Sequence, residues 1–152
     1  MSQEAIFKKT LQIGLVVESV DEAVKGYEEL GLGPWNVFNL GPSNFEDTTV
    51  HGKKQEFSFR VGFAVIGGLE FELIEPLDDK SIYSEFLEEK GPGLHHLAFE
   101  VDDFGKTVDI LKGKGVDIIQ GGRVKDSMGF AYLGTEKQFN CITEIYDKPD
   151  TE

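Results

Sequence analysis

The chain has 152 residues, and its 28 Asp and Glu against 15 Lys and Arg give a net charge of −13. This length suits about one domain with a core that needs no disulfides, and Cys141 is the single cysteine. The charge argues against nucleic-acid binding, which uses basic patches, and no apolar run approaches the roughly 18 residues of a membrane span. We therefore expect a cytoplasmic protein with a small-molecule substrate and no nucleic-acid or membrane partner.

The first unit is a strand followed by a helix. In "QIGLVVESVDEAVKGYEELG" (12–31), alternating apolar residues predict a strand, Ser19 is suited to cap a helix, and Gly31 ends it. The residues at 41–55 are polar and predict a mobile or substrate-covering loop. Short strand-like runs lie on both sides of that loop: "PWNVFNL" (34–40), "FSFRVGFAVIG" (57–67) and "LEFELIEP" (69–76).

The same pattern returns in the second part of the chain. "HLAFEVDDFGKTVDILKGKG" (96–115) aligns with the first unit without a gap, so that Gln12 falls on His96 and Gly31 on Gly115. Asp103 is suited to cap this second helix. Three strand-like runs follow again: "VDIIQ" (116–120), "MGFAYLG" (128–134) and "FNCITEIYD" (139–147).

The repeated pattern predicts an α+β fold built from two βαβββ modules. We place the modules at 8–77 and 92–148, with a linking helix within 78–91, in one domain that covers 1–152. Two curved half-sheets with helices on their outer faces leave their helix-free faces opposed. We therefore expect a cleft between the modules.

Two histidines stand side by side in "GPGLHHLAFEVDD" (91–103). Neighbouring side chains of a strand point to opposite faces, so the two imidazoles should have different roles. His96 is expected to face the cleft. His95 falls in line with the apolar residues Leu97 and Phe99 and is expected to pack on the opposite, helix-covered face.

The duplicated pattern, together with "GLHHLAFEVDD" and "ELIEPLDDKS", resembles the vicinal oxygen chelate superfamily, which includes glyoxalases, bleomycin resistance proteins and extradiol dioxygenases. Within it the chain is most similar to methylmalonyl-CoA epimerases and glyoxalase I. The resemblance covers nearly the whole chain and implies one divalent metal in the cleft, such as zinc, nickel, cobalt or manganese. Its ligands come from the first and last strand of each half, which here places them at Gln12, Glu72, His96 and Glu144.

The four donors leave the reaction open. Gln, Glu, His and Glu resemble the zinc site of eukaryotic-type glyoxalase I, whereas epimerases usually have His at the position of Gln12. The same set disfavours an extradiol dioxygenase, whose iron site resembles two histidines and one carboxylate. Two carboxylates would neutralise a dication, and the amide oxygen and imidazole would complete one face of its coordination sphere.

The resemblance implies that the protein moves a proton next to a carbonyl group. A metal on the carbonyl oxygen would stabilise the enolate formed when the neighbouring carbon loses its proton. Glu144 is the expected base, Glu72 the second candidate and Glu56 the third. We expect a metal-dependent isomerase or lyase, epimerase-like on an acyl thioester or glyoxalase-like on a glutathione hemithioacetal.

A non-catalytic protein that sequesters a drug-like compound is the alternative. Such members of the superfamily need no metal and hold a cationic compound in an acidic, aromatic cleft. A coenzyme A thioester, by contrast, would need a basic cluster, for which the candidates are Lys53, Lys54, Arg60, Arg123 and Lys125. Open strand edges also suggest a homodimer.

Overall fold

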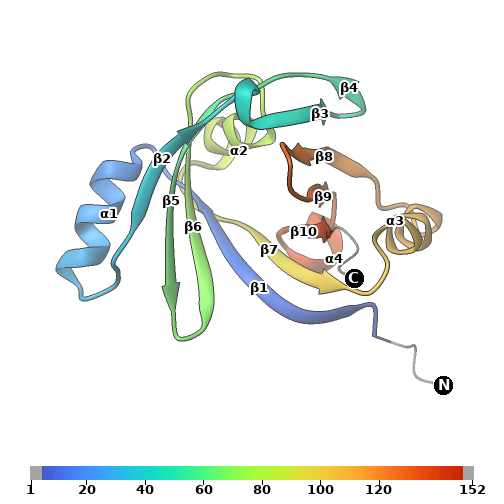
Figure 1. Cartoon of the computed structure of the whole chain (residues 1–152), viewed down its shortest axis with the longest axis horizontal. Helices are drawn as coiled ribbons and strands as arrows, with labels where there is room; N and C mark the ends of the chain where they lie inside the picture. The colour runs from blue at the N-terminus through green and yellow to red at the C-terminus, as the bar shows by residue number, and fades with distance from the viewer. Residues whose placement is uncertain (1–4, 149–152) are drawn as a thin grey trace.

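The computed structural model describes residues 5–148, in which ten strands form one curved sheet (Figure 1). The strands of the first part are β1 (Phe7–Val16), β2 (Asn36–Leu40), β3 (Phe45–Val50), β4 (Lys53–Lys54), β5 (Phe59–Ile66) and β6 (Leu69–Pro76). Those of the second part are β7 (Gly93–Val101), β8 (Ile118–Val124), β9 (Gly129–Leu133) and β10 (Ile142–Asp147). The helices are α1 (Val20–Glu29), α2 (Ile82–Lys90), α3 (Phe104–Gly113) and α4 (Glu136–Phe139), with a 3-10 turn η1 (Pro42–Asn44).

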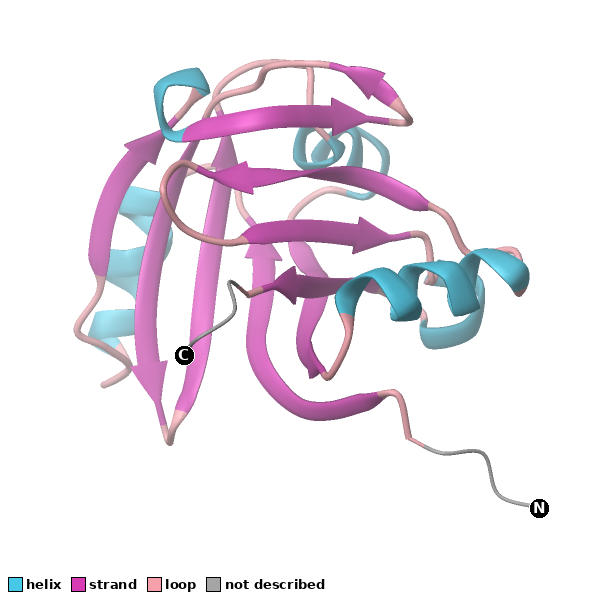
Figure 2. Ribbon diagram, turned by 45° about the vertical axis from the view of Figure 1, so that its right-hand side comes forward, coloured by secondary structure: helices cyan, strands magenta, loops and turns pink. Residues whose placement is uncertain are grey.

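The sheet has the strand order β2-β5-β6-β1-β7-β10-β9-β8-β3-β4. The first strands of the two halves, β1 and β7, pair antiparallel at its centre, and each also pairs in parallel with the last strand of its own half, β6 or β10. In Figure 2, β1 and β7 are the curved strands in the middle of the sheet. The strands β2, β5 and β6 stand steeply on one side of them, and the other strands of the second half lie nearly horizontal on the other. The predicted α+β fold of two βαβββ modules in a curved mixed sheet is confirmed.

The helices begin where their capping residues predict. The side chain of Ser19 accepts a hydrogen bond from the backbone of Glu22 at the start of α1, and Asp103 does the same for Lys106 at the start of α3. Helix α1 packs on β5 and β6, and α3 packs on β10, at opposite ends of the molecule (Figure 1). Both helices therefore lie outside the curve of the sheet and leave its inner face free.

The segment 41–55, predicted to be a mobile or substrate-covering loop, contains regular structure, and its Phe45 lines the cavity described below. It forms η1, β3 and β4, and β3 pairs antiparallel with β8 of the second half. The anchor is Phe45, whose ring packs against Phe57, Phe59 and Phe130. The sequence did not predict these strands because one aromatic residue in a polar run is a weak signal, and the pairing partner lies some seventy residues further along the chain.

The strand β7 contains a β-bulge at the two histidines. Gly14 of β1 pairs with His96, whereas the next residue, Leu15, pairs with Leu94, so His95 is an extra residue in the ladder. The bulge breaks the alternation of faces. His95 and His96 do not point to opposite sides of the sheet as predicted, and their Nδ1 atoms lie 2.9 Å apart.

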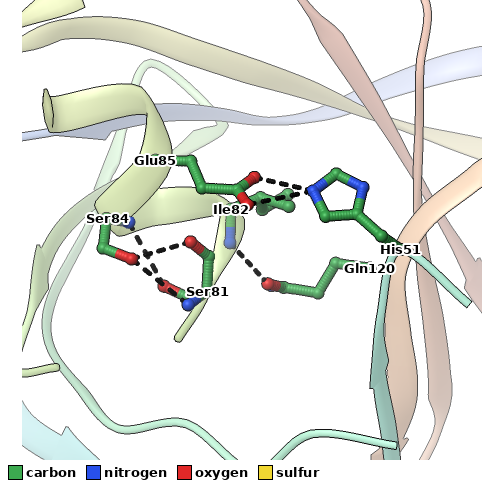
Figure 3. A network of polar contacts seen from close by, with 6 residues as sticks. All are labelled: His51, Ser81, Ile82, Ser84, Glu85 and Gln120. Carbon is green, nitrogen blue, oxygen red and sulfur yellow. Dashed lines mark hydrogen bonds and ion pairs between the residues drawn. The ribbon is translucent and has the colours of Figure 1, made fainter. Parts of the chain in front are cut away.

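Helix α2 lies at one end of the cleft and is held there by polar contacts (Figure 3). The side-chain oxygen of Gln120, on β8, accepts a hydrogen bond of 2.9 Å from the backbone of Ile82, and Nε2 of His51, in the β3–β4 turn, contacts Glu85 Oε1 at 2.8 Å. These contacts join the first turns of α2 to strand β8 of the second half and to the β3–β4 turn, whose strand β3 pairs with β8. Among residues 5–148, no helix has the length and apolarity that crossing a bilayer requires.

Candidate metal centre

A cavity of about 410 Å³ opens on the inner face of the sheet, between the two halves. Its wall is largely aromatic, and the rings that line it include Phe45, Phe59, Phe63, Phe130, Tyr132 and Tyr146. Three carboxyl groups, those of Glu70, Glu72 and Glu144, also line it, and among the described residues 5–148 one basic side chain, Lys148, does so. The cavity is therefore an apolar pocket with an acidic floor.

The structure brings the four predicted donors together at this floor. Gln12, Glu72, His96 and Glu144 lie on the neighbouring strands β1, β6, β7 and β10, and each is no more than 7 % exposed. Nε2 of His96 lies 2.8 Å from Oε1 of Gln12. It lies 3.5 Å from Oε1 of Glu72 and 3.5 Å from Oε1 of Glu144. One imidazole nitrogen thus faces an oxygen from each of the three other strands.

Gly14 makes room for this arrangement. The imidazole of His96 lies across the backbone of Gly14, its pairing partner on β1, so that a Cβ atom at position 14 would fall on the ring. No side chain other than hydrogen fits there without moving the histidine. Gly14 therefore allows the His96 ring to reach across β1 towards Gln12.

Glu70 is a site residue that the sequence analysis missed. It precedes Glu72 by two residues on β6, so both side chains lie on the cavity face. Oε1 of Glu70 accepts a hydrogen bond of 2.6 Å from Nε2 of Gln12, which turns the amide oxygen of Gln12 towards His96. The alternation of "LEFELIEP" was a signal that could have identified it.

Burial favours the protonated forms of Glu72 and Glu144, two of the three carboxyl groups at the floor. It raises the pKa of Glu144 to about 8, while a hydrogen bond from the hydroxyl of Tyr146 to its Oε1 opposes that rise. Burial, and then the nearby carboxyl of Glu144, raises the pKa of Glu72 well above its ordinary value. Oε1 of Glu72 is also buried without a hydrogen-bond partner. An acceptor in this position lacks the positive charge or donor that would normally offset its burial.

Both imidazoles are held neutral. Burial lowers the pKa of His95 to about 3, helped by the charge of Lys90, and burial lowers the pKa of His96 well below its ordinary value. The His95 ring sits among the rings of Tyr83, Phe86 and Tyr132. A neutral imidazole can give a lone pair to a cation, which an imidazolium cannot.

The donor set fits a divalent cation. Ligands at about 2.1 Å from an ion are about 3.0 Å apart at right angles and about 3.4 Å apart in a tetrahedron. The contacts of His96 Nε2, at 2.8, 3.5 and 3.5 Å, are near this range. Residues 5–148 hold no group of three His, Cys, Asp or Glu side chains already in metal-binding geometry. Glu72, His96 and Glu144 are thus not at coordination spacing, and the features that fit a cation are the approach of their side chains to one nitrogen and the unpartnered Oε1 of Glu72.

Two predictions from the sequence fall outside the cavity. Glu56 is exposed and follows β4, away from the four donors, so the structure does not bring it to the candidate centre. Of the basic residues considered for a coenzyme A ester, Arg60 binds Asp21 and Asn39. Arg123 and Lys125 flank Val124 of the cavity wall, but neither lines the cavity, and Arg123 donates a hydrogen bond to the backbone oxygen of Ser127.

The paired βαβββ modules, with donors on the first and last strand of each, define the vicinal oxygen chelate architecture. The sequence profile of the Glyoxalase/Bleomycin resistance protein/Dioxygenase superfamily matches residues 11–132, and the chain belongs to this superfamily.

Similar proteins include an uncharacterized one and several enzymes. The chain is 34% identical to the uncharacterized protein YqjC of Bacillus subtilis, over 70% of this chain and 67% of that protein. It is also 34% identical to an ethylmalonyl-CoA/methylmalonyl-CoA epimerase of Cereibacter sphaeroides, over 55% of this chain and 65% of the epimerase. By contrast, its match to the 4-hydroxyphenylpyruvate dioxygenase of Legionella pneumophila spans only 32% of that enzyme.

Solved structures share the fold. A methylmalonyl-CoA epimerase of Streptomyces coelicolor, in complex with 2-nitronate-propionyl-CoA, superposes with a TM-score of 0.70 at 19% identity. The superposition covers 96% of this chain and 98% of that one.

Proposed function

We propose that the protein is a metal-dependent isomerase that moves a proton at the carbon next to a thioester carbonyl, as an acyl-CoA epimerase does. The observation that carries the proposal is the convergence of three side-chain oxygens on Nε2 of His96 inside an apolar cavity. The similarity to a CoA-ester epimerase over 65% of its length supports the choice of substrate class.

Gln12, Glu72, His96 and Glu144 would hold one divalent cation. When bound, the cation supplies a Lewis acid that stabilises negative charge developing on a carbonyl oxygen. The protein contributes the fixed positions of the donors and the apolar wall, which excludes water and strengthens the electrostatic interactions at the floor. Glu70 holds the amide of Gln12 so that its oxygen, and not its nitrogen, faces the donor set.

Glu144 is the base that we assign to proton removal. Its pKa of about 8 lies near neutral pH, where a carboxyl group can both accept and return a proton. The hydroxyl of Tyr146 donates to Oε1 at 3.1 Å and steadies the carboxylate after the proton leaves. Glu72, from the other half, is the second candidate and would deliver a proton from its own strand.

The acyl group would lie against the aromatic wall, and its carrier would leave through the open side of the cavity. Among residues 5–148, Lys148 is the one basic side chain of the cavity wall, so it is the side chain that could meet a phosphate of such a carrier. The three carboxyl groups of the wall favour a small uncharged acyl group inside.

Two measurements test the proposal. Elemental analysis of the purified protein should find about one divalent metal per chain, lost in a Gln12→Ala, Glu144→Ala double variant. Solvent deuterium should then enter a chiral acyl thioester next to its carbonyl, and the exposed Glu88→Gln variant serves as the control for both. Exchange into a glutathione hemithioacetal alone would instead indicate a glyoxalase, and exchange into neither substrate by metal-loaded protein would overturn the enzymatic proposal.

A non-catalytic binding protein is the second candidate, and the aromatic wall with its three carboxyl groups favours it. Such a cavity suits an aromatic cation, which would gain both stacking and charge attraction. Tight binding of such a compound by metal-free protein, together with the absence of any metal uptake, would favour this function over the enzyme.

A further inference from the structure

The environment of His95 poses a problem that packing does not solve. The side chain is 1 % exposed, and of its two ring nitrogens only Nδ1 has a polar partner, the Nδ1 atom of His96. Nε2 is buried without a hydrogen bond. Burying an unpaired polar atom costs free energy, and a phenylalanine would fill the same aromatic niche without that cost. The imidazole is therefore matched to one neighbour, His96.

The Nδ1–Nδ1 contact links the tautomers of the two rings. A neutral imidazole carries its proton on one nitrogen and a lone pair on the other. In a hydrogen bond between two such rings, one Nδ1 must donate and the other must accept. The position of the proton on His95 thus fixes the position of the proton on His96.

In the arrangement described here, Nε2 of His96 lies at hydrogen-bond distance from the amide oxygen of Gln12, so Nε2 carries the proton and donates it. Nδ1 of His96 is then the acceptor and Nδ1 of His95 the donor. A cation at the donor set requires the opposite arrangement, because Nε2 of His96 must present its lone pair.

We infer that His95 is a positioning residue, which accepts a hydrogen bond from Nδ1 of His96 and so directs the Nε2 lone pair of His96 to the cation. This inference rests on the proposed function. On loading, His96 carries its proton on Nδ1, and His95 carries its proton on Nε2. The pair holds two ring protons in either state, so the change needs no net proton uptake or release by the two rings.

The surroundings of His95 are compatible with this exchange. Within residues 5–148 nothing else hydrogen-bonds to either of its ring nitrogens, so no competing partner fixes its tautomer. The rings of Tyr83 and Tyr132 stand edge-to-face with the imidazole at centroid distances of 5.4 Å and 5.9 Å. An N–H among aromatic rings can find a weak acceptor in one of their faces. The niche therefore admits a proton on Nε2 of His95 without a conventional partner.

The experiment uses zinc as the probe and the full-length chain. Nitrogen-15 NMR of the histidine rings should report a proton on Nε2 of His96 without zinc, and protons on Nδ1 of His96 and Nε2 of His95 with zinc. Zinc affinity, measured by competition with a chromophoric chelator, should fall by about ten- to a hundredfold in His95→Phe. In His95→Asn, whose amide oxygen can replace Nδ1 as the acceptor, most of that affinity should return.

Phe86→Leu is the control for packing, since it disturbs the niche of His95 but touches no ring nitrogen. It should lower the melting temperature and leave zinc affinity unchanged. If the wild-type protein binds no zinc, cobalt or nickel, the proposed metal centre fails and this inference with it. If the wild type binds zinc but His95→Phe binds it equally well, or if the His96 tautomer stays the same on loading, the inference alone is wrong.

Discussion

The two halves of the sheet place different chemistry at equivalent positions. On β1 of the first half the proposed donor is Gln12, an amide turned inward by Glu70 at the cavity wall. On β7 of the second half the proposed donor is His96, which is fully buried, lies at a bulge and contacts His95. A duplicated scaffold thus keeps the positions of the donors while each half supports its donor by different means.

This difference suggests a division of labour. The second half supplies the imidazole and Glu144, whose pKa is near neutral pH, and both are surrounded by buried rings. The first half supplies a weaker amide donor and a second carboxyl group, with a third carboxyl at the wall. We expect the second half to dominate cation binding and proton transfer and the first half to adjust them.

The largest expected effect is on proton transfer. Glu144→Gln should slow deuterium exchange into the thioester by about 10²- to 10⁴-fold, because it removes the assigned base while keeping the shape of the side chain. Glu72→Gln should have a smaller effect. The rates are measured with metal-saturated proteins, and a larger loss in Glu72→Gln would transfer the role of base to the first half.

The cation affinities of the two first-strand donors should differ. His96→Ala should weaken binding by more than about a hundredfold, since removal of groups that merely support a ligand already costs ten- to a hundredfold. Gln12→Ala should cost about tenfold, as expected for loss of a neutral oxygen donor. Competition with a chelator measures both, and equal losses would remove the proposed asymmetry between the halves.

Gly14→Ala should destabilise the fold through the second half, although the substitution is on β1. Its Cβ would overlap the His96 ring, so the ring or the backbone would have to move. This displacement should lower the free energy of unfolding by about 1–3 kcal/mol. Gly26→Ala, in the exposed part of α1 where a Cβ meets no atom within 4 Å, should raise it by about 0.5–1 kcal/mol. Urea denaturation compares the two, and equal stability changes would contradict the close approach of His96.

The stability of the metal-free protein should fall as pH rises from about 6.5 to about 8. In this range the folded protein keeps a proton on Glu144 that the unfolded chain has lost. Below about 6.5 this effect is offset, because the unfolded chain protonates its histidines while burial keeps His95 and His96 neutral. A cation binds the deprotonated carboxylates, so its stabilising effect should grow from about pH 6.5 to about pH 8. Melting temperatures with and without zinc at pH 6.5 and pH 8 measure this, and Glu144→Gln should flatten the dependence. A zinc effect independent of pH would argue that these carboxyl groups are not ligands.

The smallest effect is expected at Glu56. Because the side chain is exposed outside the cavity, Glu56→Gln should change the exchange rate by less than about twofold, within the range of ordinary surface substitutions. A substantially slower rate would mean that the segment 41–55 brings Glu56 to the substrate and that the first half contributes a further carboxyl group.

Local signals in the sequence predicted much of this structure. The caps at Ser19 and Asp103 predicted where two helices begin, and the repeated strand pattern placed Gln12 and His96 at matching positions, while Glu72 and Glu144 were predicted from the resemblance to the superfamily. The Gly67–Gly68 pair makes the turn between β5 and β6, with both residues at positive φ. These features depend on residues a few positions apart, which is the range over which propensity and periodicity act.

The sequence by itself therefore determined the repeated βαβββ scaffold, and its resemblance to the superfamily predicted the four strand positions whose side chains meet at the cavity floor. Only the tertiary structure decided that β3 joins the second half, that a bulge sets the His95 and His96 rings against each other, and that Glu70 rather than Glu56 reaches the site. The physical reason is that register and bulges are set by pairing between strands distant in sequence, so one extra residue in a ladder changes the face of a side chain without any local signal.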